Sequence, residues 1–232
     1  MAAVSRIIVT GTAGALGGAV AEHFTARGTE VIGLDVAYEN TTLAASDEHD
    51  DLHTMKVDLT SAKDVRAALA TIRDSRGQID GLVHCTGGFR WSQFHEISDK
   101  DVEFLVQVNL LSTLWMVRGV LGDFREQGFG RIVLVSSRST LAPGVGEGAY
   151  TASKAGLNAL VKSVAAEVAA DDITINAVLP SIINTAANRT EMPDADHSTW
   201  VPLDSLAAVI GNFFEPVGAP LNGALLPVSG RT

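Results

Sequence analysis

Short runs of apolar, mostly β-branched residues recur along the chain, and most are followed by a stretch in which apolar residues return every three or four positions. A continuous apolar run is typical of a strand buried on both faces, whereas the longer period is typical of a helix. The expected strands cover residues 6–10, 29–34, 53–57, 80–84, 132–135, 173–179 and 223–228. The expected helices cover residues 19–27, 61–76, 98–127, 150–170 and 203–214.

This alternation predicts an α/β fold: a single Rossmann-type doubly wound parallel sheet flanked by helices. About seven strands are expected, in the order 3-2-1-4-5-6-7 with right-handed crossovers. No internal repeat, low-complexity segment or linker divides the sequence, so residues 1–232 are predicted to form one domain. Residues 181–202 show neither period, and a long irregular segment in a compact domain is often a lid.

The composition narrows the class of protein. Apolar residues make up 46% of the 232 residues and charged ones 19%, which suits a sizeable core and not a disordered chain. The net charge of −10 argues against a nucleic acid or an anionic membrane as the main partner. The longest largely apolar run, 110–117, is too short to span a bilayer, and no leader pattern precedes the first strand. With one cysteine, a reducing compartment is favoured, and we expect a soluble cytoplasmic protein.

Three polar features are expected to be structural. The charge run 47–51 lacks the spacing of metal ligands, so we interpret it as a solvated loop and expect no metal site. Cys85 has no cation-rich neighbourhood in the sequence and is interpreted as a packing residue. Asn109 lies in an apolar helical segment, where an amide usually needs a bend or an ordered water to satisfy it.

A glycine-rich turn joins the first strand to the first helix. Its glycines are Gly11, Gly14, Gly17 and Gly18. A turn of this kind aims backbone N–H groups and a helix N-terminus at a phosphate, and the missing side chains admit a pyrophosphate. A plain tight turn is the alternative, but the density of glycines favours a dinucleotide.

Asp35 follows the second strand, 18 residues beyond Gly17. An acid at this place can accept hydrogen bonds from the ribose hydroxyls of a dinucleotide, although Asp35 could also simply begin a turn. The glycine turn and the residues after Asp35 contain no Arg or Lys to receive a 2′-phosphate. The pattern therefore favours NAD over NADP.

Tyr150 and Lys154 are four residues apart in an expected helix, and Ser137 lies thirteen residues before the tyrosine. Side chains at this spacing share a helix face, so the ammonium is expected to lower the phenol pKa and make Tyr150 a general acid or base. A surface helix face is the alternative. It is disfavoured because Asp35, Ser137 and other polar residues all follow strands, and the carboxyl ends of parallel strands share one edge where ligands bind.

Taken in order, these motifs make the chain similar to the short-chain dehydrogenase/reductase family, over nearly all of its length. Thr10-Gly11-x-x-x-Ala15-x-Gly17 resembles the family's TGxxxGxG loop, with Ala15 in place of the middle glycine. His84-Cys85-Thr86-Gly87 stands where the family has NNAG and keeps only the glycine. The segment 180–185 resembles PGxxxT, with Ser181 replacing the glycine.

The resemblance implies roles for particular residues. The implied catalytic tetrad is Asn109, Ser137, Tyr150 and Lys154, with Asn109 anchoring a water that links Lys154 to solvent. The implied cofactor residues are Gly11, Ala15, Leu16, Gly17, Asp35, Asp58, Leu59, Thr86, Gly87, Tyr150, Lys154, Pro180, Ile183 and Thr185. The implied activity is hydride transfer between NAD(H) and a small alcohol or ketone, with Tyr150 moving the proton.

The substrate is left open. Candidate pocket residues are Arg90, Trp91, Phe94, Arg138, Leu141, Asn184, Arg189 and Trp200. The turn Thr86-Gly87-Gly88-Phe89 is also similar to that of dihydropteridine reductases, which keep the tyrosine and lysine but lack the serine, so Ser137 argues against that identity. A dinucleotide-binding sensor or scaffold without turnover is a further alternative. Family members usually form dimers or tetramers through helices corresponding to 100–127 and 148–170, which implies a homo-oligomer here. The apolar residues of these helices are expected to offer more surface than one sheet face needs: Leu110, Leu114, Met116, Val117, Leu157, Leu160, Val161 and Val164.

Overall fold

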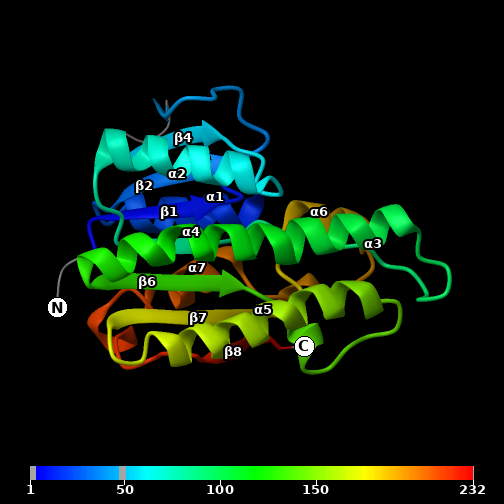
Figure 1. Cartoon of the computed structure of the whole chain (residues 1–232). Helices are drawn as coiled ribbons and strands as arrows, with labels where there is room; N and C mark the ends of the chain where they lie inside the picture. Colours follow the sequence, from blue (N-terminus) through cyan, green and yellow to red (C-terminus); the bar gives the residue numbers. More distant parts are fainter. Residues whose placement is uncertain (1–3, 47–50, 232) are drawn as a thin grey trace.

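Eight strands hydrogen-bond into one sheet in the computed structural model, which describes residues 4–46 and 51–231 (Figure 1). The strands are β1 (Arg6–Thr10), β2 (Glu30–Asp35), β3 (Ala44–Ala45), β4 (Leu52–Lys56), β5 (Gly81–His84), β6 (Phe129–Val135), β7 (Asp172–Pro180) and β8 (Leu225–Val228). Their order is β3-β4-β2-β1-β5-β6-β7-β8, and every neighbouring pair is parallel except β3 with β4.

The predicted order of strands is confirmed, and the sheet gains one short strand at its edge. Without β3, the order is the expected 3-2-1-4-5-6-7. The antiparallel strand β3 pairs Ala44 with Thr54 inside a region expected to be a polar loop. Two residues are too few to show a period, so this strand leaves no pattern in the sequence. Most of the charge run 47–51 lies outside the described residues.

Helices cover both faces of the sheet. The helices are α1 (Ala15–Thr25), α2 (Ala62–Arg76), α3 (Asp99–Leu105), α4 (Ser112–Gln127), α5 (Gly148–Glu167), α6 (Ala186–Glu191) and α7 (Leu203–Gly211), with the π-helical turn η1 (Val106–Leu111) and the 3₁₀ turns η2 (Arg138–Thr140), η3 (His197–Thr199) and η4 (Pro216–Gly218). In β1, Ile8 faces the core beneath α2, α4 and α5, whereas Ile7 faces the core beneath α1 and α7. Both isoleucines are fully buried, as expected of a strand covered on two sides.

The expected long helix 98–127 is interrupted by the π-turn η1. By length and composition alone, the helical stretch Asp99–Gln127 could cross a membrane. It instead lies along the sheet, where Met116, Val117 and Phe124 pack into the core and are almost fully buried. A membrane-spanning role is therefore not needed to explain its apolar residues.

Helix α1 begins at Ala15, four residues earlier than expected, so the glycine motif lies partly inside it. A Cβ at Gly17 would lie 2.0 Å from the carbonyl oxygen of Gly11. Close packing of helix on turn therefore requires glycine here, and because glycine is a poor helix former, it conceals the start of the helix.

Candidate active site

Ser137 and Tyr150 meet at the carboxyl edge of the sheet, where the arrow of β6 points toward α6 and the start of α5 (Figure 1). Ser137 follows β6 by two residues and caps η2, and Tyr150 is the third residue of α5. The hydroxyl of Ser137 lies close enough to that of Tyr150 to lower the pKa of the phenol, as expected when a hydroxyl donates to the tyrosine oxygen. The pair is therefore positioned to bind one carbonyl oxygen between two hydroxyl donors.

The expectation that Lys154 lowers the pKa of Tyr150 is wrong for this arrangement. The pKa of Tyr150 is raised, chiefly by burial, and the hydrogen bond from Ser137 opposes this while the charge of Glu147 adds to it. The ammonium of Lys154 donates instead to the carbonyl oxygen of Val135 at 2.9 Å. Burial lowers the pKa of Lys154 to about 8, so its charge titrates near neutral pH.

Asn109 lies in the π-turn η1, and its fully buried amide holds the turn after β5. Its Oδ1 accepts from Gly88 N at 2.8 Å, and its Nδ2 donates to Gly88 O and to Ser153 Oγ, both at 3.0 Å. A π-turn inserts a residue into a helix and is frequent at functional sites. The expected bend is thus found, and the side-chain contacts are to protein groups.

Gly87 lets the tetrad residues approach one another. A Cβ at this position would lie 2.9 Å from both Asn109 Oδ1 and Lys154 Nζ. A side chain at position 87 would displace both the amide of Asn109 and the ammonium of Lys154. Packing therefore requires the glycine, which is the one residue of the NNAG turn that this chain retains. The structure therefore brings Asn109, Lys154, Ser137 and Tyr150 to the same edge, as the sequence predicts.

His84, the last residue of β5, connects β1 to the N-terminus of α4. It is fully buried, with Nδ1 3.0 Å from Thr10 Oγ1 and Nε2 3.2 Å from Ser112 Oγ. Ser112 donates its proton to Val108 O at 2.6 Å, so Nε2 must donate to Ser112 and Nδ1 must accept from Thr10. Burial lowers the pKa of His84 to about 3, which keeps it neutral in this bridge between β1, β5 and the Asn109 helix.

A cavity of about 650 Å³ extends from the glycine turn along the same edge. Eleven of the predicted cofactor residues line it: Gly11, Ala15, Leu16, Gly17, Asp35, Asp58, Leu59, Thr86, Gly87, Ile183 and Thr185. Tyr150, Lys154 and Pro180 do not line this cavity. Pro180 ends β7, whereas Tyr150 and Lys154 belong to α5.

The cavity has the features that a dinucleotide requires. Gly11 has φ +72° and Gly17 has no room for a side chain, so the turn exposes backbone to the cavity. The hydroxyl of Thr86 is buried without a hydrogen-bond partner among the described residues. Asp35 accepts from Ala13 N at 3.1 Å and from Ala37 N at 3.0 Å, which holds its carboxylate at the cavity wall.

Comparison with known proteins decides the family. The sequence pattern of the family described as short chain dehydrogenase matches residues 5–196. The chain belongs to this family. Its members are oxidoreductases that bind a nicotinamide cofactor, so the expected family and fold class are confirmed.

Similar curated proteins are named as oxidoreductases. Acetoacetyl-CoA reductase of Allochromatium vinosum is 28% identical over 96% of both chains. The 3-oxoacyl-[acyl-carrier-protein] reductase FabG of Escherichia coli is 31% identical over 81% of this chain and 77% of its own. The uncharacterized oxidoreductase YxjF of Bacillus subtilis is 31% identical over 86% and 79%.

Several residues that line or border this cavity are not predicted by the sequence, and one predicted pocket residue lies elsewhere. Phe104, Gln107, Val108 and Asn188 also line the cavity. Cys85 lines it too, but burial raises the pKa of its thiol to about 12, in keeping with a packing residue. The candidate pocket residue Trp200 is buried against His197 and not at the mouth. Residues in a π-turn or in a loop contact show no periodic pattern in the sequence. Their positions at the cavity could therefore be known only from the folded structure.

Ser139 is a positioning residue that the sequence does not single out. Both its N–H, at 3.2 Å, and its hydroxyl, at 3.0 Å, donate to Ser137 Oγ. With its lone pairs so occupied, Ser137 keeps its own proton for donation toward Tyr150 or a substrate oxygen.

Changing Ser139 to alanine is expected to lower kcat/KM about 2- to 12-fold, the range set by one net hydrogen bond. Ser139→Thr, which keeps the hydroxyl, should retain most of the activity. In a Ser137→Ala background, Ser139→Ala should have little further effect, because the group that it orients is gone. Equal losses in both backgrounds would show that Ser139 acts only on folding.

The segment 181–202 lies over the cavity but is more regular than expected. It contains α6 and η3, and Ile183 pairs with Val201 through an isolated bridge. The helix α6 spans only six residues, too short to show a convincing period, and Thr185 caps it by accepting from Asn188 N. Through Ile183, Thr185 and Asn188, the segment forms part of the cavity wall.

Closure of this segment over the cofactor stays a prediction. Backbone amides of 181–202 are expected to exchange with solvent more slowly when NAD and a substrate analogue are present, because contacts with the ligand would hold the segment closed. Hydrogen exchange measured by mass spectrometry tests this, with the core strand β6 as an internal control. Equal protection with and without ligand would contradict a lid.

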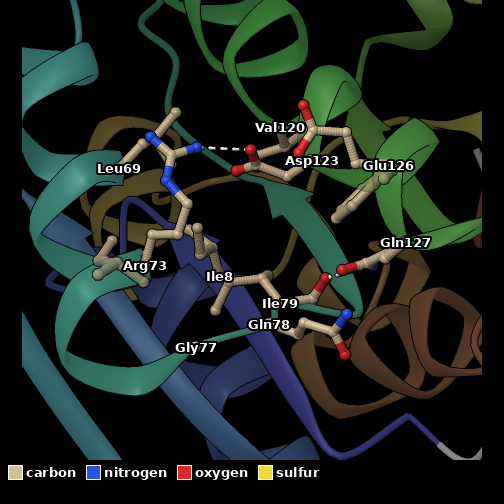
Figure 2. Close-up of a pocket in the computed structure, with 12 residues that line it drawn as sticks. Ile8, Leu69, Arg73, Gly77, Gln78, Ile79, Val120, Asp123, Glu126 and Gln127 are labelled. Carbon is tan, nitrogen blue, oxygen red and sulfur yellow. Dashed lines mark hydrogen bonds and ion pairs between the residues drawn. The ribbon is translucent and has the colours of Figure 1, made fainter.

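A second hollow, of about 290 Å³, lies between the C-terminal parts of α2 and α4 (Figure 2). Figure 2 shows Arg73 paired with Asp123 across it and Gln127 bonded to the carbonyl oxygen of Ile79. Ile79 precedes β5, so this hollow is at the amino edge of the sheet, opposite the tetrad. The chemistry of the family is therefore assigned to the other cavity.

Proposed function

We propose that this chain is an NAD-dependent oxidoreductase that interconverts a small alcohol and its ketone, with Tyr150 as the general acid and base. The observation that carries the proposal is the closeness of the Ser137 and Tyr150 hydroxyls, at the same sheet edge as a cavity lined by eleven predicted cofactor residues. A sensor without turnover would have no need for a serine oriented by Ser139 toward a buried phenol.

The proposed mechanism assigns one task to each side chain. The nicotinamide, when bound, supplies or accepts the hydride. The hydroxyls of Ser137 and Tyr150 donate to the substrate oxygen and stabilise the negative charge that develops there. Tyr150 gives its proton to that oxygen during reduction and takes it back during oxidation. The buried ammonium of Lys154 is proposed to hold the ribose of the nicotinamide.

The cofactor residues are proposed to act as the cavity suggests. Gly11 and Gly17 admit the pyrophosphate to the backbone, Asp35 receives the ribose hydroxyls, and Thr86 offers its unpartnered hydroxyl. Asp58, whose Oδ1 accepts from Thr60 N at 2.9 Å, lies where the adenine is expected. No metal enters this proposal, and among the described residues no three His, Cys, Asp or Glu side chains gather as a metal site would need.

A spectrophotometric screen tests the proposal. The consumption or formation of NADH is followed at its absorbance maximum with ketones, secondary alcohols, 3-oxoacyl thioesters and quinonoid dihydropterins. We expect turnover with ketones or alcohols. Tight NADH binding without turnover of any of them would favour the sensor. Turnover of the dihydropterin alone would favour an activity like that of dihydropteridine reductases. The placement of Phe89 beside Tyr150 is the observation that supports this second candidate function.

We also propose that the chain forms a homodimer or homotetramer through α4 and α5. Of the residues expected to offer surplus apolar surface, Met116, Val117, Leu157, Val161 and Val164 are buried in the core. Leu110, Leu114 and Leu160 remain partly exposed. Leu110 and Leu160 pack against the core beneath α4 and α5, and Leu114 belongs to α4, so these three leucines support the proposal.

Light scattering at micromolar concentration is expected to give the mass of two or four copies of the 24.3 kDa chain. Replacing Leu114 and Leu160 by glutamate should shift that mass toward the monomer, because it places charge in the proposed apolar contact. The exposed Val217 provides a matched control, since Val217→Glu lies outside the two helices. A monomer mass for the unmodified protein would overturn the proposal.

The remaining proposals concern the location of the protein in the cell and its binding partners. The acidic surface and single cysteine support a cytoplasmic location and a small-molecule partner, not a nucleic acid or a membrane.

A further inference from the structure

The exposed aromatic side chains of this protein are gathered in one place. Among the described residues, the Phe and Trp side chains that are exposed are Phe89, Trp91 and Phe94, all within one six-residue loop after β5. Two further exposed apolar residues, Leu141 and Val145, lie in the loop between η2 and α5. Exposed apolar clusters of this kind mark binding sites more often than scattered single residues do.

Two hydrogen bonds connect these two loops. Trp91 Nε1 donates to Val145 O at 2.9 Å, and Ser92 N donates to Gly146 O at 3.0 Å. Gly146 has φ +79°, and a Cβ there would lie 2.3 Å from the indole of Trp91, so the glycine lets the ring lie flat on the loop. The indole therefore has a fixed position although it is 61% exposed.

This aromatic surface is continuous with the proposed catalytic pair. The ring centroids of Phe89 and Tyr150 are 4.9 Å apart, and the rings are nearly perpendicular at 82°. Since the hydroxyl of Ser137 also lies close to that of Tyr150, a carbonyl oxygen bound by these hydroxyls would leave its substituent beside Phe89. The aromatic loop therefore borders the place where the body of a substrate lies.

The charges beside this surface do not favour an anionic substrate. The guanidinium of Arg90 pairs with Asp101, with Nε to Oδ1 at 3.2 Å, and stacks over the ring of Phe104 at 4.3 Å. Glu147 lies close enough to Tyr150 for its charge to raise the phenol pKa. Phosphate-bearing thioesters would gain little attraction here, in a chain of net charge −10.

We propose that the loops of Phe89, Trp91, Phe94, Leu141 and Val145 bind the ring of an uncharged aryl ketone, and that aryl ketones are the substrate class of this site. The inference rests on the proposed function. Reduction adds a hydride from NADH to the carbonyl carbon and the Tyr150 proton to its oxygen, giving the secondary alcohol and NAD⁺. Aromatic side chains select a flat ring over an aliphatic one because edge-to-face pairs add attraction beyond the area buried.

Binding without turnover tests this proposal separately from the proposed function. Acetophenone and methyl cyclohexyl ketone are matched in size and differ in the aromaticity of the ring. Each is titrated calorimetrically into the protein saturated with NAD⁺, because a ketone and the oxidised cofactor cannot react. We expect acetophenone to bind about 2- to 12-fold more tightly, the range that aromatic pairs contribute.

Variants show whether the loop causes that preference. The double variant Phe89→Leu with Phe94→Ala keeps apolar bulk beside Tyr150 but removes two of the three exposed rings, so its preference for acetophenone should be smaller than that of the unmodified protein. The control Val217→Ala shortens another exposed apolar residue and should leave the preference unchanged. Binding of NADH, followed by its fluorescence, should be the same in all three proteins, which excludes general damage.

Two results would overturn the inference. Equal affinity of the unmodified protein for the two ketones, or a preference that is undiminished in the double variant, would remove the aromatic loop from substrate binding. A lower mass of the double variant in light scattering would show that a second copy of the chain covers the loop. A protein that prefers the aryl ketone in binding but never reduces it would instead contradict the proposed function alone.

Discussion

Replacement of Tyr150 by phenylalanine is expected to lower turnover by roughly 10²–10⁴, the contribution of a positioned acid and base, while NADH binding stays nearly unchanged. Phenylalanine keeps the ring that packs against Phe89 and removes only the hydroxyl, which lies close to that of Ser137. Turnover is measured by NADH absorbance with the best substrate of the screen, and binding by NADH fluorescence. Full activity of this variant would exclude Tyr150 from the chemistry and favour the sensor.

A second measurement separates the acid–base role of Tyr150 from a structural one. The hydrogen bond from Ser137 lowers the pKa of Tyr150, so Ser137→Ala should raise it. Alcohol oxidation needs the phenolate, and the rise of its rate with pH should therefore move to higher pH in this variant. A profile that falls in height but does not move would contradict titration of Tyr150 in the reaction.

The strands of the fold could be predicted because they are buried on both faces. The first strand was expected at 6–10 and is found at Arg6–Thr10, where the fully buried Ile7 and Ile8 face opposite cores. A run that is apolar on both sides has an unambiguous pattern. The edge strand β3 and the helix α6 could not be predicted, since two and six residues are too few to display a period.

The surface was predicted less well than the core. Met116 and Leu157 looked like surplus apolar surface, but they are fully buried against the sheet. Helical spacing tells which residues share a face and does not tell how wide a face the sheet covers. The error therefore comes from tertiary packing, which no local pattern contains.

The identity of the site residues followed from chain order, whereas their environment did not. Asn109, Ser137, Tyr150 and Lys154 reach one edge because parallel strands end there. The raised pKa of Tyr150 depends on its burial, and burial is a property of the folded chain. The histidine bridge likewise joins His84 to Thr10, 74 positions apart in sequence.

The second large effect expected is a preference for NAD over NADP, and it depends on Asp35. Its carboxylate is held at the cavity wall by Ala13 N and Ala37 N. The ribose diol of NAD can donate to this ionised acceptor, whereas the phosphate of NADP brings a like charge to it. Two unit charges ~4 Å apart repel by about 1 kcal/mol in water and about 4 at an intermediate dielectric. A preference of about 5- to 700-fold in kcat/KM is expected, since about 1.4 kcal/mol is tenfold.

Exchanging the local charge should reverse this preference. Val36 lines the cavity and is 61% exposed, so an arginine there can reach a 2′-phosphate without disturbing the core. The variant Asp35→Ala with Val36→Arg should favour NADP, and Val36→Arg alone should show an intermediate preference because the carboxylate remains. Thermal unfolding of all three proteins controls for the lost bonds to Ala13 and Ala37. If the unmodified enzyme uses NADPH as well as NADH at equal, saturating substrate, Asp35 does not select the cofactor.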